Sequence, residues 1–171
     1  RMEHIEHQLA ELSRNQGIFR ELLQGIPEEK YLWRWHKDKW NLLEIVCHLY
    51  DEEREDFRAR TKSVLENPKA PLTTFNPILW VKDRNYVQKD YNEILAAFLD
   101  ERQASIDWLN SLTNPNWENA FIHPKKGSLT ASFFLSNWVA HDYLHIRQIL
   151  DLQYKYIQES TGYILDYAGN W

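Results

Sequence analysis

Three histidines have types and spacing that could do chemistry. His141 and His145 lie one helical turn apart in an apolar stretch near the end of the chain, and His48 lies in an earlier helix-like segment. Residues i and i+4 share one face of a helix, so the two imidazoles of the pair can reach one ion without distorting the backbone. Three neutral nitrogen ligands leave a position for water or substrate, which distinguishes catalytic zinc-like sites from closed structural ones. The pattern therefore predicts a metal site.

The surroundings of the pair favour this interpretation. At about 100° per residue, both histidines fall within roughly 20° of the line through Phe134, Trp138 and Leu152, so they face inward. Two charged imidazoles on an inward face would repel each other, and each buried ring needs a partner for its nitrogens. A shared cation meets both requirements. The alternative is a pair of ordinary hydrogen-bonded histidines in the core or a cleft.

The helix face around His48 allows two interpretations. Four acidic residues lie within roughly 60° of His48 on the helical wheel, and four apolar or aromatic residues lie opposite. The acidic residues are Glu44, Asp51, Glu52 and Glu55, and the opposite set is Leu43, Val46, Tyr50 and Phe57. The acidic face is either a solvated surface or the lining of a polar, partly open cavity. In the second case Glu52 could be a fourth ligand, an acceptor for an imidazole N–H, or a general base, and we take it as the candidate catalytic residue.

Two residues beside these histidines are assigned structural roles. The sequence His141-Asp-Tyr-Leu-His145 resembles the H-E-x-x-H pattern of zinc proteases, but Asp142 lies about 80° off the histidine line and no histidine follows. We therefore predict that Asp142 orients a neighbouring group or makes a polar contact within the fold. Cys47 lies about 100° from His48 on the wheel, so we predict a plain buried thiol.

Gln148 follows the pair on the inward line, where it could contact substrate or form an interhelical hydrogen bond. The sequence alone favours neither role for this side chain.

The composition predicts a cytoplasmic protein without a nucleic-acid partner. The chain has 171 residues, of which 43% are hydrophobic, which is ample for one packed domain spanning residues 1–171. Its formal charge is −5, and no cluster of Lys and Arg is longer than Lys125-Lys126, so a nucleic-acid footprint is not expected. A single cysteine excludes an intramolecular disulfide, and no apolar run resembles a signal peptide or a membrane span.

Helical periodicity supplies the elements that would position these residues. Apolar residues at steps of three and four predict a first helix over residues 3–24. Asn41, with Glu44 three residues later, resembles a capping box and predicts a second helix over 41–65. The intervening segment 27–40 is expected to be a connection.

The second half of the chain repeats this pattern after a long link. Three prolines in segment 68–84 predict an extended crossover instead of a tight hairpin. A third helix is expected over 87–113, a loop over 116–127, and a fourth helix from residue 129 or 130 to about 153. This fourth helix carries the histidine pair.

The predicted fold class is all-α. No stretch alternates with period two over enough residues to suggest a sheet. Four helices with a long second connection predict a four-helix bundle with a crossover between helices 2 and 3, in up-down-down-up order. The aromatic segment 154–171 is expected to pack on the bundle or on a partner subunit, which makes a homodimer possible.

Two sequence motifs carry a family resemblance. Trp40-Asn-Leu-Leu-Glu-Ile-Val-Cys-His48-Leu, followed by Asp51-Glu52, and the later His141-Asp-Tyr-Leu-His145-Ile-Arg-Gln148-Ile resemble the DinB-like (YfiT-like) metal-binding four-helix bundle proteins over essentially the whole chain. In that family one metal-ligating histidine comes from the second helix and two from the last. The resemblance thus implies a metal triad at His48, His141 and His145.

The resemblance also implies a class of activity. Characterised relatives include transferases and isomerases that use low-molecular-weight thiols, so we expect a divalent-metal enzyme (Zn, Ni or Fe) acting on a small molecule, most simply as a thiol-dependent S-transferase or a related hydrolase. In such an enzyme the ion would lower the pKa of a bound water or thiol, and a carboxylate such as Glu52 could accept the proton. The alternative is a non-catalytic bundle that binds a ligand or a partner chain, with a structural metal or none.

Overall fold

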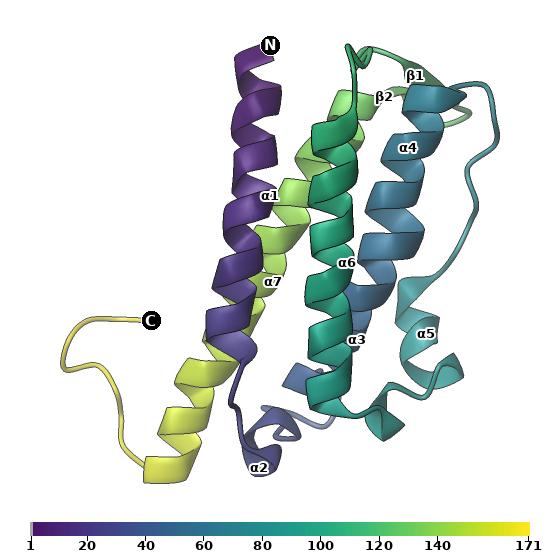
Figure 1. Ribbon diagram of the computed structural model, residues 1–171. Coiled ribbons are helices and arrows are strands. Elements are labelled where there is room, and N and C mark those ends of the chain that lie inside the picture. The colour runs from purple at the N-terminus through teal and green to yellow at the C-terminus, as the bar shows by residue number, and fades with distance from the viewer. Residues whose placement is uncertain (1) are drawn as a thin grey trace.

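Four long helical segments run side by side in the computed structural model, which describes residues 2–171 (Figure 1). The first and last segments run in one direction and the two middle ones in the other, so the predicted up-down-down-up bundle with its crossover is confirmed. Their bounds are α1 (Met2–Leu23), the continuous run of α3 (Leu42–Glu52), η1 (Glu53–Phe57) and α4 (Arg58–Glu66), then α6 (Tyr91–Ser111) and α7 (Ala131–Thr161).

The helix ends follow from capping residues. The Asn41 side chain accepts from the Glu44 N–H while the Glu44 carboxylate accepts from the Asn41 N–H, so the predicted capping box starts α3. Thr130 caps α7 with a single bond, in which its hydroxyl oxygen accepts from the Phe133 N–H at 3.0 Å. The predicted end of this helix at about residue 153 is wrong, because α7 continues to Thr161. Gly162 ends it with a φ of 72°, which a residue with a Cβ rarely adopts.

The connections contain short elements that the sequence analysis did not foresee. These are α2 (Glu28–Tyr31), α5 (Pro77–Asp83), the 3₁₀ turn η2 (Tyr86–Gln88), and a hairpin of β1 (Ala120–His123) and β2 (Gly127–Thr130). The hairpin lies mostly within the segment predicted as a loop and pairs His123 with Gly127. Its strands have only four residues each, too few for alternation to be recognised.

A π-helical turn interrupts the second long helix. In η1 the hydrogen bonds span one residue more than in an α-helix, so the following side chains are rotated by about 100° relative to a regular wheel. The expectation that Phe57 lies opposite His48 is therefore wrong. Its ring packs 4.8 Å from the ring of His141, on the histidine side of the helix.

Buried polar residues form a layer between two apolar clusters of the core. Phe19, Leu49, Phe98 and Ile149 belong to the cluster near α5, whereas Leu12, Phe57, Leu109 and Val139 belong to the cluster near the hairpin. On each long segment a buried polar side chain lies between members of the two clusters, and these are Asn15, Glu53, Arg102 and Asp142. A bundle that buries this many polar groups must satisfy them internally or through a ligand.

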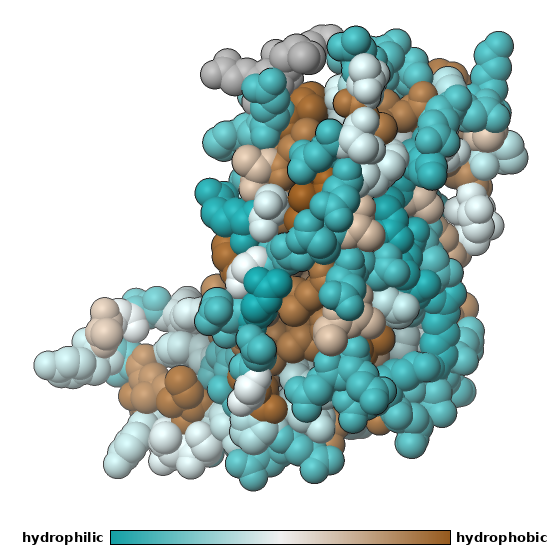
Figure 2. Space-filling model, in the orientation of Figure 1, coloured by the Kyte–Doolittle hydropathy of each residue, from teal (hydrophilic) through white to brown (hydrophobic). Residues whose placement is uncertain are grey.

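Most of the face shown in Figure 2 is hydrophilic, with apolar side chains exposed on the segment that follows α7. Among the described helices, none has the length together with the apolar character that crossing a membrane requires.

Candidate metal centre

The structure brings the three predicted histidines to one point. The Nε2 atom of His141 lies 3.1 Å from Nε2 of His48 and 3.0 Å from Nε2 of His145. Among the described residues, these three form a group whose ligand atoms all lie within 4.8 Å of one another. One ring comes from α3 and two come from successive turns of α7.

Neighbouring aromatic rings hold two of the imidazoles in place. The Trp40 ring lies 4.9 Å from the ring of His48, and Phe57 packs on His141 at 4.8 Å. Phe57 reaches this position because of the π-helical turn. The turn therefore contributes directly to the geometry of the centre.

Gln148 orients the third imidazole. The Nδ1 atom of His145 lies 2.8 Å from Oε1 of Gln148. An amide oxygen only accepts, so Nδ1 carries the proton and the lone pair of Nε2 points into the centre. This contact within α7 differs from both roles considered for Gln148 from the sequence.

Burial keeps all three imidazoles neutral. Desolvation, followed by the charge of His145, lowers the pKa of His48 to about 3. Desolvation is also the largest cause that lowers the pKa of His141 well below its usual value and the pKa of His145 less far. Neutral imidazole is the form that binds metals, so the donors are ready at neutral pH.

A divalent cation fits this donor set. The Nε2 atom of His141 lies 3.0–3.1 Å from the Nε2 atoms of the other two rings, and lone pairs at this spacing repel unless a cation or a ring N–H lies between them. A tetrahedral ion with metal–nitrogen bonds of about 2.0–2.1 Å separates its ligand atoms by about 3.3 Å, close to the observed spacing. Zinc, nickel and iron all accept imidazole ligands. The buried Nδ1 of His48, on the other side of the ring from Nε2, has no hydrogen-bond partner among the described residues.

Glu52 lies in a different environment from the one predicted. It is 3% exposed and stands outside the three-residue ligand group, so the structure does not place it as a fourth ligand. Burial, then a hydrogen bond with Asp56, raises the pKa of Glu52 to about 9, and its Oε1 has no hydrogen-bond partner. Glu52 is therefore protonated at neutral pH in this state. Its role as a general base stays a prediction.

The other acidic residues around His48 are mostly buried and paired, so the solvated-surface interpretation is wrong. Glu44 is 4% exposed and pairs with Arg34, while Asp51 is 5% exposed and accepts from Arg54 at 2.7 Å. Glu55 is less buried and pairs with Arg84. A wheel identifies which residues share a face, but the packing of α5 and η2 on α3 decides that the face is covered.

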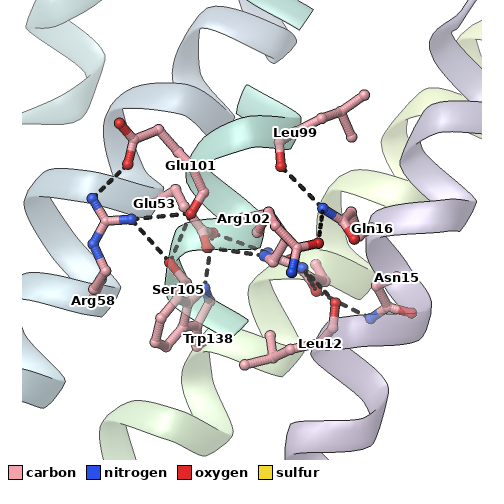
Figure 3. Close-up of polar contacts among 12 residues, drawn as sticks. Leu12, Asn15, Gln16, Glu53, Arg58, Leu99, Glu101, Arg102, Ser105 and Trp138 are labelled. Atoms are coloured by element: carbon pink, nitrogen blue, oxygen red, sulfur yellow. Dashed lines mark hydrogen bonds and ion pairs between the residues drawn. The ribbon is translucent and has the colours of Figure 1, made fainter. Parts of the chain in front are cut away.

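Arg102 forms a second buried cluster (Figure 3), and one of its partners, Asp142, directly follows His141 on α7. Its guanidinium donates to both oxygens of Glu53, at 2.9 and 3.0 Å, and to both oxygens of Asp142, at 2.9 and 2.7 Å. Trp138 donates to Glu53 at 2.9 Å, and Asn15 donates to Asp142 at 3.1 Å. The predicted polar contact of Asp142 within the fold is thus confirmed.

Sequence analysis missed Glu53 and Arg102, although one signal was present. Arg102 interrupts the apolar stripe of Leu95, Phe98 and Leu109 at the helical spacing, where a charge needs a buried partner. The prediction for Cys47 is confirmed, since the thiol is 1% exposed and burial raises its pKa to about 12. Such a thiol is neither a metal ligand nor a nucleophile at neutral pH.

Known proteins show the same fold. The model of the DinB superfamily matches residues 11–149. The structure of YfiT from Bacillus subtilis, described as a probable metal-dependent hydrolase with an unusual four-helix bundle topology, superposes with a TM-score of 0.78 at 18% identity, covering 96% of this chain and 91% of that chain. A search of curated proteins finds no match. Because the family model spans most of the chain, including all three histidines, this protein belongs to the DinB superfamily.

Proposed function

We propose that this protein is a divalent-metal-dependent enzyme that acts on a small molecule, in a thiol-dependent S-transfer reaction. The observation that carries the proposal is the convergence of three neutral imidazoles, with Nε2 of His141 lying 3.1 Å from that of His48 and 3.0 Å from that of His145. No carboxylate or thiol of the described residues joins this group, so a fourth position is left for a reactant.

The residues of the chain have distinct tasks in this proposal. A divalent ion held by the histidines would lower the pKa of a thiol or water at its open position, so that a nucleophile exists at neutral pH. Gln148 holds His145 in the tautomer that binds, and Trp40 and Phe57 fix the rings of His48 and His141. Glu52, four residues after His48, is our candidate for proton transfer.

Hydrolysis is the second candidate, because the same open position could hold water and the similar YfiT structure is described as a probable metal-dependent hydrolase. A non-catalytic ligand-binding bundle is the third. Cytoplasmic location and homodimer formation stay predictions from the sequence.

The first experiment measures metal content and metal-dependent melting of the purified protein. We compare wild type with a His141→Ala/His145→Ala variant and with a matched control, His4→Ala/His7→Ala, which removes two exposed histidines. Wild type and control should each retain about one ion and melt at a higher temperature with it, whereas the first variant should lose both properties and keep its helical spectrum. A wild type that binds no divalent ion and gains no stability from zinc, nickel or iron would contradict the proposal.

The second experiment separates the reaction classes. The loaded protein is assayed with cysteine or glutathione plus a chlorobimane electrophile, and separately with a nitrophenyl ester in the absence of thiol. S-transfer predicts bimane conjugation that depends on His141 and His145. Ester cleavage without thiol would favour hydrolysis instead.

A further inference from the structure

A groove reaches the candidate metal centre along the outer face of α7. It has a volume of about 690 Å³ and is lined by Leu144, His145, Arg147, Gln148, Asp151 and Trp171. His145 and Gln148 belong to the centre itself, so a molecule in this groove would meet the ligand shell directly. A groove of this size accommodates a small organic molecule.

The segment after α7 supplies one wall of this groove. Gly162 turns the chain, and the segment folds back toward α7 (Figure 1). The Tyr154 hydroxyl donates to the Leu165 carbonyl. The indole of Trp171 stacks on Tyr154 at 4.4 Å with an interplanar angle of 8°. The Trp171 indole N–H also donates to Asp151 at 2.8 Å. These three contacts hold the segment after α7, most of which is otherwise exposed.

The exposed face of Trp171 suits a planar apolar group. One face of the indole is covered by Tyr154, yet Trp171 as a whole residue is 64% exposed. An open indole face offers a planar apolar surface on which a ligand ring can stack. Leu144, which is 55% exposed, extends the apolar part of the lining.

The charges around the groove favour an anion. The carboxylate of Asp151 is compensated by Lys155 at 2.7 Å and by the Trp171 indole. The charge of Arg147 is one of the causes that lower the pKa of Asp151, but Arg147 forms no hydrogen bond or ion pair with any described residue, so its N–H groups can still donate to a ligand. Three neutral imidazoles would also leave the charge of a divalent ion uncompensated.

We infer that the groove binds a small anion with a planar apolar part, which stacks on Trp171 while its carboxylate, sulfonate or phosphate group pairs with Arg147. The inference rests on the proposed function for the position of the ion, and it names the substrate class of the same site. Trp171 and Arg147 are thus specificity-determining residues.

The test measures binding of 2-naphthoate and of neutral 2-naphthylmethanol to the zinc-loaded protein by calorimetry. Trp171→Ala should weaken the binding of both probes, by about tenfold, because each loses a stacking partner. Arg147→Gln should weaken naphthoate by about tenfold and leave the alcohol unchanged. The matched controls are Tyr167→Ala, an exposed ring in the same segment, and Lys126→Gln, an exposed cation in the hairpin, and neither should change binding.

Metal content and oligomeric state are determined on the same samples. If zinc binds but the alcohol binds as well as naphthoate, or if neither Trp171→Ala nor Arg147→Gln changes binding, the inference is wrong and the proposed function stands. If no ion binds and both variants still weaken the binding of naphthoate, the inference about the groove is supported and the proposed metal-dependent function is wrong. A change from dimer to monomer on Trp171→Ala, with naphthoate binding unaltered, would overturn the inference and make the segment an interface between copies.

Discussion

Two buried polar clusters lie side by side in this bundle and differ in completeness. His141 and Asp142 are adjacent on α7, yet one belongs to the histidine centre and the other to the Arg102 cluster. Every nitrogen of the Arg102 guanidinium has an acceptor, and both carboxylates that face it are fully engaged. The histidine centre instead holds three converging nitrogens and an unpartnered Nδ1.

The difference between the clusters separates a structural network from a binding site. The Arg102 ion network fixes one packing of four helices and pairs every nitrogen of the guanidinium and all four carboxylate oxygens, although the buried Oδ1 of Asn15 beside it has no partner. An incomplete cluster of neutral donors has a lower free energy once a cation joins it. The complete network therefore belongs to the framework that holds the incomplete one in place.

The largest expected effect is loss of the complete network. Arg102→Met leaves Glu53 and Asp142 as buried charges without a counter-ion, so we expect a loss of about 3–5 kcal/mol in the free energy of unfolding. Urea unfolding followed by circular dichroism measures this loss. Adding Glu53→Gln and Asp142→Asn to Arg102→Met should recover part of it, because the stranded charges are removed. A cost below about 1 kcal/mol for Arg102→Met alone would show that the network is not the framework.

A smaller effect is expected at the edge of the incomplete cluster. Gln148→Ala removes the acceptor that orients His145, and the affinity for zinc should fall about 10–100-fold. Competition with a chromogenic chelator measures this affinity. The free energy of unfolding without metal should hardly change, and Gln158→Ala on the same helix serves as the control. If Gln148→Ala leaves the zinc affinity unchanged, Gln148 does not orient His145 for metal binding.

The third expected effect depends on pH and concerns Glu52, which belongs to neither cluster. Its pKa is about 9 in the folded protein, against an ordinary value of 4.5, so the folded state holds a proton that the unfolded state releases. Wild type should therefore lose stability as the pH rises from about 4.5 to about 9. Glu52→Gln cannot ionise and should be more stable than wild type near pH 9, with no advantage at pH 4.

Urea unfolding at both pH values tests this sign, with the exposed Glu66→Gln as the control. An advantage of Glu52→Gln that grows toward low pH would contradict the assignment. The same variant tests the catalytic prediction, because a general base at Glu52 requires loss of activity in the loaded enzyme.

Local sequence signals were sufficient for most of the fold. The Asn41 capping box, helical periodicity and the prolines after α4 depend on neighbours within a few residues, so the long helices and the crossover could be predicted. Signals that extend over only four residues were too weak, which explains why the hairpin was missed. The end of α7 was misplaced because nothing before Gly162 stops the helix.

The candidate site also has features that the local sequence predicts and features that depend on packing between helices. The spacing of His141 and His145 sets their common face from the sequence alone, because helical geometry is local. The approach of His48, the rotation of Phe57 by the π-helical turn, and the protonation of Glu52 depend on packing between helices. A helical wheel with 3.6 residues per turn includes neither the extra residue of a π-helical turn nor any contact between segments.

By itself, then, the sequence determined which residues could serve as ligands and which helices carry them, since type and spacing are properties of a single segment. Only the tertiary structure decided that the acidic face of α3 is covered, that Arg102 pairs with both Glu53 and Asp142, and that Trp171 borders the groove beside His145. These features depend on residues 40 or more positions apart for the Arg102 pairs and 20 apart for the Trp171 contact with Asp151, and their energies exist only after the chain has folded.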